Sequence, residues 1–335
     1  MKNKTSIIAE AGVNHNGNIN LALKQVDLAS KSRADYVKFQ TYCTEELVQK
    51  KVGLARYQKN NLKTTSSQYK LLKKLELSES DHLKIINRCR FKKIKFLSSP
   101  FDLKSIDLLK KLNLKLFKIP SGEITNVPYL KKIGSLKKKL ILSTGMSTIE
   151  EVKKAINILI SSGTKKKDIT ILHCSTEYPA DKNNLNLLSI PLLKKIFKIN
   201  VGYSDHSLGF QASLTAVALG AKIIEKHFTT NRKLSGPDQK ASLSPNEFMN
   251  FVKEIRNVEK ILGKNVKKPY SAELKNSKYI RKFIVANRNI KKGEKLSEKN
   301  ITTKRAAVGI PASKWNLVIG KKAKKKFLYD ENIKI

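Results

Sequence analysis

Short runs of apolar and β-branched residues recur through roughly the first two thirds of the chain, and polar residues follow each run. Runs of this kind are typical of buried β-strands. The candidate strands are residues 7–13, 36–39, 94–97, 116–119, 140–142, 169–173, 200–203 and 222–225. The pattern therefore predicts eight strands.

Between most of these runs, apolar residues recur at three- and four-residue spacing, which predicts amphipathic helices. Examples are residues 20–32, 104–112, 148–161 and 210–219. An eightfold alternation of strand and helix predicts an α/β fold, a parallel (β/α)8 TIM barrel. Residues 42–77 are longer than a usual connection, so we expect an active-site excursion with a helix of its own; a solvated insertion is the alternative.

The pattern changes after the last predicted barrel helix, residues 248–262. Residues 264–279 are polar, include Pro269 and lack sustained periodicity, so we expect a linker there. The barrel domain is expected to span residues 1–263, and a second domain residues 280–335.

The second domain is expected to be small and β-rich. Its β-like runs are residues 283–286 and 315–319, with turn signals at Gly293 and Gly320. About 55 residues are marginal for independent stability, so we expect this domain to pack on something.

Composition narrows the class of protein. Hydrophobic residues make up 40% of the 335 positions and charged residues 28%, which fits a water-soluble globular protein. No apolar run reaches the length of about 18 residues that a membrane helix needs, and the first ten residues lack a signal-peptide core. We therefore expect no membrane partner and a cytoplasmic location. The three cysteines are widely spaced, which favours reduced thiols.

Lys and Arg total 68 against 27 Asp and Glu, a net charge of +41 that raises a nucleic-acid hypothesis. The basic residues are mostly Lys, are spread along the whole chain and lack aromatic interleaving. This distribution favours a solvated lysine-rich surface, so we expect no nucleic-acid partner.

Polar and ionisable residues stand at nearly every predicted strand end, where a barrel places its chemistry. His206 and His227 directly follow neighbouring strands, so their imidazoles should converge and could hold a divalent metal ion. Two structural histidines are the alternative. We expect His15 to shape a loop, His82 to lie on a helix surface and His173 in the barrel interior.

Two lysines and two serines form a second group at strand ends. Lys38 and Lys118 can bind phosphate and carboxylate groups, while Ser121 and Ser143 can fix orientation. Carboxylates for proton transfer or for sugar hydroxyls are available at Glu10, Glu123 and Asp238. These residues favour a metal-dependent barrel enzyme that acts on a phosphorylated or acidic metabolite.

Seven segments, in order, resemble the sialic acid synthase family. They are IAEAGVNHNG at 8–17, VKFQT at 37–41, FKIPSGE at 117–123, LSTGM at 142–146, TEYP at 176–179, YSDHS at 203–207 and EKHF at 225–228. The resemblance implies a (β/α)8 barrel that condenses phosphoenolpyruvate with an N-acylated mannosamine-type sugar, followed by a C-terminal antifreeze-like (SAF) domain.

The resemblance also implies roles for individual residues. His206 and His227 would bind the divalent metal, usually Mn²⁺, with Mg²⁺ and Co²⁺ as alternatives. Phosphoenolpyruvate would contact Lys38, Ser99, Lys118, Ser121, Ser143 and Ser204. Around the sugar and the reacting centre would lie Glu10, Glu123, Tyr178 and Asp238, with Glu10 or Glu123 as the general base. Arg305 would be inserted into the partner's barrel mouth in a domain-exchanged homodimer.

The chain departs from the family pattern at two places. Gln239 replaces a common histidine after Asp238, and Ala306-Ala307 replaces the usual Pro-Gly after the inserted arginine. The second departure puts the shape of that loop, and hence its sugar contacts, in question.

The resemblance implies an N-acetylneuraminate synthase, in which a sugar, phosphoenolpyruvate and water give a nine-carbon 2-keto acid and phosphate by C–O cleavage. A synthase of N,N'-diacetyllegionaminate is the alternative, and one of pseudaminate fits less well, because Thr176–Pro179 resembles the neuraminate and legionaminate members more. A Schiff-base aldolase with Lys38 or Lys118 as nucleophile is a rival that would not need the histidine pair.

Overall fold

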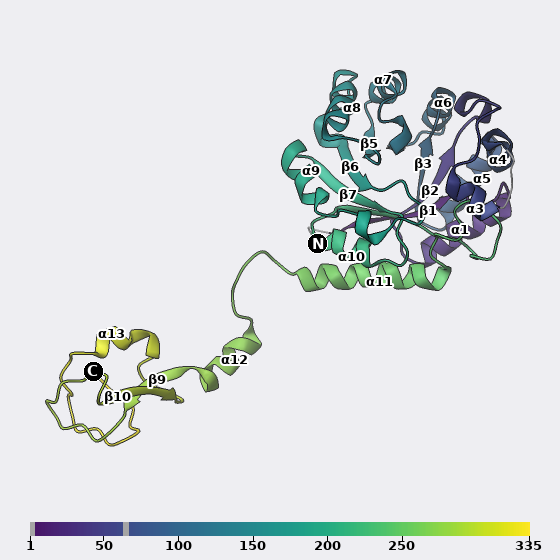
Figure 1. The fold of residues 1–335 in the computed structure, drawn as a ribbon. Helices are drawn as coiled ribbons and strands as arrows, with labels where there is room; N and C mark the ends of the chain where they lie inside the picture. The colour runs from purple at the N-terminus through teal and green to yellow at the C-terminus, as the bar shows by residue number, and fades with distance from the viewer. Residues whose placement is uncertain (1–3, 63–66) are drawn as a thin grey trace. The chain divides into compact units, whose positions relative to one another are not determined.

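The computed structural model describes residues 4–62 and 67–335 (Figure 1). The chain divides into two compact units, Met1–Gly263 and Lys264–Ile335. Within the described ranges, no helix is both long and apolar enough to cross a membrane.

The first unit contains one parallel sheet of eight strands, as the sequence predicted. The strands are β1 (Ser6–Gly12), β2 (Tyr36–Thr41), β3 (Lys95–Pro100), β4 (Leu116–Ile119), β5 (Lys139–Ser143), β6 (Ile169–Cys174), β7 (Asn200–Asp205) and β8 (Ile223–His227). Their hydrogen-bonded order is β3-β2-β1-β8-β7-β6-β5-β4, and β3 and β4, at the two ends of that order, also lie in contact. This cyclic order is that of a (β/α)8 barrel.

Helices surround the strands in Figure 1. They are α1 (Ile19–Lys31), α2 (Thr44–Leu47), α3 (Arg56–Leu62), α4 (Gln68–Leu75), α5 (Glu79–Phe91), α6 (Leu103–Lys111), α7 (Val127–Ser135), α8 (Ile149–Ser161), α9 (Ser189–Phe197), α10 (Gln211–Ala218) and α11 (Pro245–Leu262), with short 3₁₀ turns at Ser121–Glu123, Lys166–Asp168 and Lys182–Asn184. Local sequence sets several starts: Thr148 and Glu151 form a capping box at α8, as Ser78 and Asp81 do at α5.

The apolar core has two layers. The larger layer fills the space between the strands and the helices. A smaller layer inside the barrel consists of Ile8, Leu97, Ile141 and Leu172, all at most 1% exposed. These side chains close the barrel interior, so the chemistry must lie at an end of the barrel.

The excursion between β2 and α5 carries more helix than the sequence predicted. It holds α2, α3 and α4, although residues 63–66 of the predicted excursion lie outside the described residues. Leu75 of α4 packs with Val13 and Tyr42 in a small apolar cluster beneath the excursion. The excursion is therefore attached to the barrel by packed side chains, which a solvated insertion would lack.

Two of the minor histidine predictions are wrong. His82 is fully buried, with Nε2 2.8 Å from Thr41 Oγ1 and Nδ1 2.8 Å from the Ser78 carbonyl oxygen. His173 donates from Nε2 to the Leu185 carbonyl oxygen and stacks on Tyr203, on the helix side of the strand. Its neighbour Leu172 takes the interior position instead, because side chains alternate along a strand.

The second unit is small. It contains α12 (Ser271–Ile280), the antiparallel pair β9 (Lys282–Ala286) and β10 (Ile301–Arg305), a 3₁₀ turn at Ala312–Lys314, and α13 (Trp315–Val318). Its core consists of Ile284, Ala286, Ile290, Leu296, Ile301, Val318, Ala323, Phe327 and Ile333.

Two predictions for this unit need correction. Residues 315–318 form a helix instead of a strand, because Trp315, Val318 and Ile319 stand at helical spacing and pack together on the small core. The later part of the segment predicted as linker forms α12, whose side chains are not buried and whose start is held by a hydrogen bond from Tyr270 N to Glu273.

Candidate active site

A cavity of about 210 Å³ lies at the carboxyl ends of the barrel strands. Eleven of the thirteen predicted site residues line it: Glu10, Lys38, Ser99, Lys118, Ser121, Ser143, Tyr178, Ser204, His206, His227 and Asp238. The fold thus brings together residues that are more than 200 positions apart in the chain.

The other two predicted residues do not line this cavity. Glu123 lies in the 3₁₀ turn after β4, where Asn126 Nδ2 donates to its carboxylate at 2.6 Å, and partial burial raises its pKa. Arg305 ends β10 in the second unit and is exposed.

Two imidazoles meet at one side of the cavity. The ring centroids of His206 and His227 are 5.6 Å apart, and the Tyr178 ring lies 4.2 Å from that of His206. Burial lowers the pKa of His206 to about 4 and that of His227 well below its usual value, so both rings are neutral at pH 7.

The hydrogen bonds of these rings fit metal ligands. His206 Nδ1 donates to the Ser175 carbonyl oxygen, which leaves the lone pair on Nε2, an arrangement typical of metal-binding histidines. Ser204 Oγ lies 3.4 Å from this Nε2 but donates its proton to Glu225 at 2.9 Å. His227 Nδ1 is buried and has no hydrogen-bond partner among the described residues. A Cβ on Gly12, which has φ of +53°, would lie 3.3 Å from both His227 Cε1 and Glu10 Oε1. Glycine at position 12 therefore leaves room for the side chains of His227 and Glu10.

Two lysines and two glutamates form a buried charge network beside the imidazoles. Lys38 Nζ lies 2.8 Å from Glu10 Oε2 and 3.8 Å from Glu225 Oε2. Lys118 Nζ lies 3.0 Å from Glu225 Oε1, which also accepts a hydrogen bond from Ser204 Oγ at 2.9 Å. All four charged side chains are at most 5% exposed, so each charge depends on its partners.

The two glutamates of this network differ in proton affinity. Burial raises the pKa of Glu10 to about 7, helped by the charge of Glu225 and opposed by Lys38. Burial also opposes ionisation of Glu225, but Lys118 and Lys38 overcome it and lower its pKa to about 2. Glu225 is therefore a permanent anion, whereas Glu10 can exchange a proton near neutral pH.

Hydroxyl groups complete the cavity wall. Lys38 Nζ donates to Ser99 Oγ at 3.2 Å, and Gly145 N donates to Ser121 Oγ at 3.0 Å. Ser143 ends β5 and is buried. Asp238 is also buried, and burial raises its pKa to about 6.

Glu225 was not among the predicted site residues, although it stands two residues before His227 in the same strand. What marks Glu225 as a site residue is that two lysines from other strands, Lys38 and Lys118, approach its buried carboxylate. This approach is visible only in the folded structure. Gln239, the departure from the family pattern, lies outside the cavity lining. Its Nε2 donates to the Asn14 carbonyl oxygen at 3.0 Å and its Oε1 accepts from Thr229, so it joins two loops.

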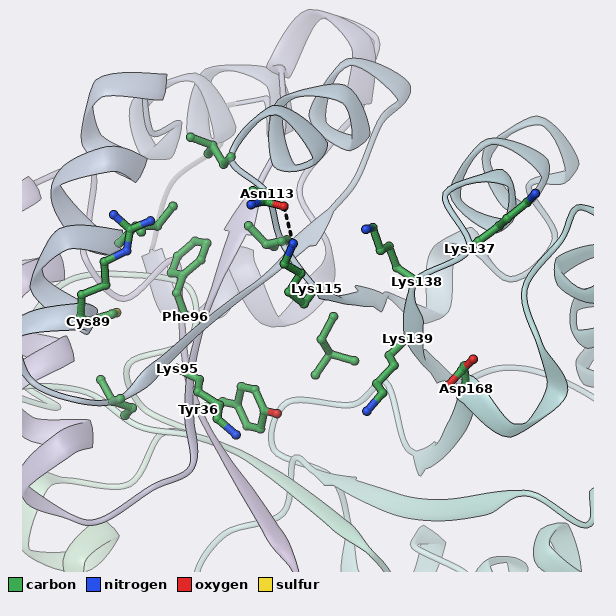
Figure 2. A pocket seen from close by; sticks show the side chains of 16 residues that line it. Tyr36, Cys89, Lys95, Phe96, Asn113, Lys115, Lys137, Lys138, Lys139 and Asp168 are labelled. Carbon is green, nitrogen blue, oxygen red and sulfur yellow. Dashed lines mark hydrogen bonds between the residues drawn. The ribbon is translucent and has the colours of Figure 1, made fainter.

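A larger cavity, of about 740 Å³, lies at the amino-terminal end of the barrel strands (Figure 2). Tyr36 and Phe96 form part of its apolar wall, and lysines surround it. The ammonium groups of Lys115, Lys138 and Lys139 point in different directions in Figure 2, and no histidine lines this cavity. The buried ion pairs and the two imidazoles thus lie at the smaller cavity, which is the better candidate for an active site.

The chain is similar to known proteins along nearly its whole length. The NeuB family model matches residues 25–267, and the SAF domain model matches residues 281–334. The chain is 50% identical to an N,N'-diacetyllegionaminic acid synthase of Campylobacter jejuni over 99% of both chains. It is 45% identical to the synthase of the same name from Legionella pneumophila, over 94% of this chain and 89% of that protein.

Among solved structures, an N-acetylneuraminic acid synthetase from Leptospira borgpetersenii superposes with a TM-score of 0.73 at 33% identity, covering 83% of this chain and 91% of that one. The expected family, fold and SAF domain are thereby confirmed. The chain belongs to the NeuB family and is a synthase of the sialic acid type.

Proposed function

We propose that this protein is an N,N'-diacetyllegionaminate synthase, which condenses phosphoenolpyruvate with a 6-deoxy diacetamido mannose-type sugar. The observation that carries the choice of sugar is the 50% identity, over 99% of both chains, to a protein of that name. Identity falls to 34% with a Campylobacter jejuni pseudaminic acid synthase and to 31% with the human N-acetylneuraminate-9-phosphate synthase. The relatives thus support the alternative of the sequence analysis better than its first choice, N-acetylneuraminate.

The type of reaction is supported by the cavity itself. Lys38 and Lys118, with the surrounding hydroxyl groups, provide charge-assisted donors for a phosphate and a carboxylate on one small molecule. Phosphoenolpyruvate carries both groups. A Schiff-base aldolase is less well supported, because both lysines are buried in ion pairs that favour the charged form over the neutral amine.

We propose that His206 and His227 hold a divalent metal ion, with Mn²⁺ as the first candidate. Their neutral rings, the bond from His206 Nδ1 to a backbone carbonyl and the buried, unpartnered His227 Nδ1 support this assignment. The bound ion would supply Lewis acidity toward the aldehyde oxygen of the open-chain sugar.

In the proposed reaction, C3 of phosphoenolpyruvate forms a bond to C1 of the sugar, and water adds to C2. The bond between C2 and the phosphate oxygen then breaks, which gives a nine-carbon 2-keto acid and inorganic phosphate. Glu10 is the best-supported acceptor for the proton of the added water, because it lines the cavity and its pKa is about 7. Glu123 lies outside the lining and is the weaker candidate.

We also propose a homodimer in which Arg305 enters the partner's cavity and binds the sugar. Arg305 is exposed and lies in the SAF domain, and it is followed by the turn residues Gly309 and Pro311. A cytoplasmic location is proposed because phosphoenolpyruvate is made there.

The test is to incubate the purified protein with phosphoenolpyruvate, Mn²⁺ and one sugar at a time. We expect phosphate release and a product of the corresponding mass with the 6-deoxy diacetamido mannose-type sugar, and at least tenfold lower kcat/KM with N-acetylmannosamine. Phosphoenolpyruvate labelled with ¹⁸O at the bridging position should deliver the label to phosphate. Preference for N-acetylmannosamine would overturn the sugar assignment, and a borohydride-trapped adduct would favour the aldolase.

A further inference from the structure

A second buried ion pair lies beside the two histidines. Lys226 Nζ is 3.1 Å from Asp205 Oδ2, and the side chains are 1% and 0% exposed. Asp205 lies opposite Lys226 in the last residue pair of the β7–β8 ladder. Each partner directly precedes one of the histidines in the sequence.

This pair lies on the face of the strands that is turned away from the cavity. In the preceding residue pair of the ladder, Ser204 and Glu225 line the cavity. Asp205 and Lys226 do not line it, as expected from the alternation of side chains along a strand. The two histidines that follow line the cavity again. The ion pair thus holds the backbone from which both imidazoles project.

Further hydrogen bonds hold the pair in place. Asp205 Oδ1 accepts from Ser207 N at 2.9 Å and from Ser207 Oγ at 2.6 Å. Its Oδ2 accepts from Ser213 Oγ of α10 at 2.5 Å. Lys226 Nζ donates to the Ser207 carbonyl oxygen at 2.5 Å. The network therefore joins β7, β8, α10 and the turn after His206.

The ladder itself does not align the two histidines. His227 still pairs with Glu10 on the β1 side, but the pairing of β7 with β8 ends at Asp205 and Lys226. His206 lies one residue beyond that last pair. We propose that Asp205 and Lys226 are positioning residues that fix the distance between the two imidazoles and thereby set the affinity of the metal site. This inference rests on the metal site proposed above.

The test uses full-length protein stripped of metal. Lys226→Met removes the buried ammonium at similar length, and Asp205→Asn removes the carboxylate charge without changing its size. The double variant, D205N with K226M, leaves no unpaired charge in the interior. Mn²⁺ binding is measured by electron paramagnetic resonance of the free ion, and thermal unfolding is followed on the same metal-free samples.

We expect K226M to weaken Mn²⁺ binding about 10- to 100-fold, as is typical when a group that orients a metal ligand is lost. In the double variant, the unfolding temperature should recover toward the wild-type value while Mn²⁺ binding stays at least tenfold weaker. If K226M does not fold, the double variant alone decides. Wild-type Mn²⁺ affinity in the double variant would overturn the inference, because the pair would then serve stability only.

Arg256→Met is the matched control. Arg256 forms ion pairs with Asp35 at 3.1 Å and with Glu259 at 2.8 Å, next to Thr5 at the amino-terminal end of β1. We expect this variant to unfold at lower temperature with unchanged Mn²⁺ affinity. Equal weakening of Mn²⁺ binding by the control would also overturn the inference.

Failure of the metal site itself gives a different result. In that case the wild type would not bind Mn²⁺, or binding would survive His206→Ala and His227→Ala, and the inference would fall with the site.

Discussion

The two ends of the barrel both present cationic side chains around a cavity, but they differ in burial. At the carboxyl end, Lys38 and Lys118 are about 4% exposed and are paired with buried glutamates around a cavity of about 210 Å³. At the amino-terminal end, Lys95, Lys115 and Lys139 are exposed around a cavity of about 740 Å³.

The difference shows why neither cavity size nor lysine number locates the active site of this chain. Lysines are abundant over the whole sequence, so a cationic rim is expected around almost any hollow of the surface. A buried lysine, in contrast, loses its hydration and is stable only with partners placed for it. Desolvated charges and neutral imidazoles at one point therefore indicate chemistry, and exposed charges do not.

The strongest test of this contrast removes the imidazoles. His206→Ala or His227→Ala should lower kcat/KM by at least about 10³-fold, because each variant removes one of the two neutral nitrogen ligands of the proposed metal site. Activity is measured as phosphate release, with circular dichroism as the control for folding. Full activity of either variant, or of the wild type in excess chelator, would contradict the metal assignment.

A second test compares two lysines of the β4 region. Lys118→Met should raise the KM for phosphoenolpyruvate by roughly 10- to 100-fold, equivalent to ~1.5–3 kcal/mol, because a desolvated charge-assisted contact is lost. Lys115→Met is the matched control: Lys115 is exposed and contacts only Asn113 among the described hydrogen bonds. An equal rise in the KM for phosphoenolpyruvate in both variants would contradict a direct contact with Lys118. It would mean that the loss of any positive charge weakens binding from a distance.

A third test asks whether the carboxyl end is completed by a second chain. Arg305→Ala should raise the KM for the sugar about tenfold or more without changing the affinity for phosphoenolpyruvate. Mixing Arg305→Ala subunits with His206→Ala subunits should restore activity, because one of the two composite sites in the heterodimer would be intact. Heterodimers that form without regaining activity would mean that Arg305 acts within its own chain or outside the site.

Much of this site could be predicted from the sequence, because a barrel brings the ends of successive strands to one rim. Eight apolar runs were sufficient to place His206 beside His227 and to bring Lys38 and Lys118 together from two different strands. Errors arose where packing overrides local pattern. Residues 315–319 have the composition of a strand, but they form a helical turn that places Val318 in the core of the second unit.

The hydrogen-bond and ion-pair partners of buried side chains could not be predicted from the sequence either. His82 was expected on a helix surface, yet Thr41 and Ser78 satisfy both of its ring nitrogens inside the protein. Glu225 has the same sequence context as many strand-end acids, and only the fold shows that it bridges Lys38 and Lys118. Such roles depend on distances between elements that no single segment contains.

A smaller effect is expected from pH. Burial raises the pKa of Glu10 to about 7, so below that pH Glu10 is mostly protonated and cannot accept the proton of the added water. The rate should therefore fall about tenfold per pH unit below a midpoint near 7. Rates are measured at saturating Mn²⁺ and substrates from pH 5.5 to 8.5. A midpoint near 4.5 would mean that Glu10 is not the base, and Glu10→Gln should lose the dependence together with most of the activity.

The smallest effect is expected at the amino-terminal end. Lys95, Lys115 and Lys139 are exposed, and each stands near the start of a strand whose other end lines the active site. Replacing all three with alanine removes three units of positive charge but no buried partner, and exposed charges are screened by salt within about 10 Å at 0.1 M ionic strength. We expect kcat and both KM values to stay within about twofold of the wild type at 0.15 M salt. A larger rise in the KM for phosphoenolpyruvate that disappears at high salt would mean that the electric field of the whole lysine-rich surface attracts the substrate. Buried and exposed charges would then differ in their effect on the chemical step but not in their effect on substrate binding.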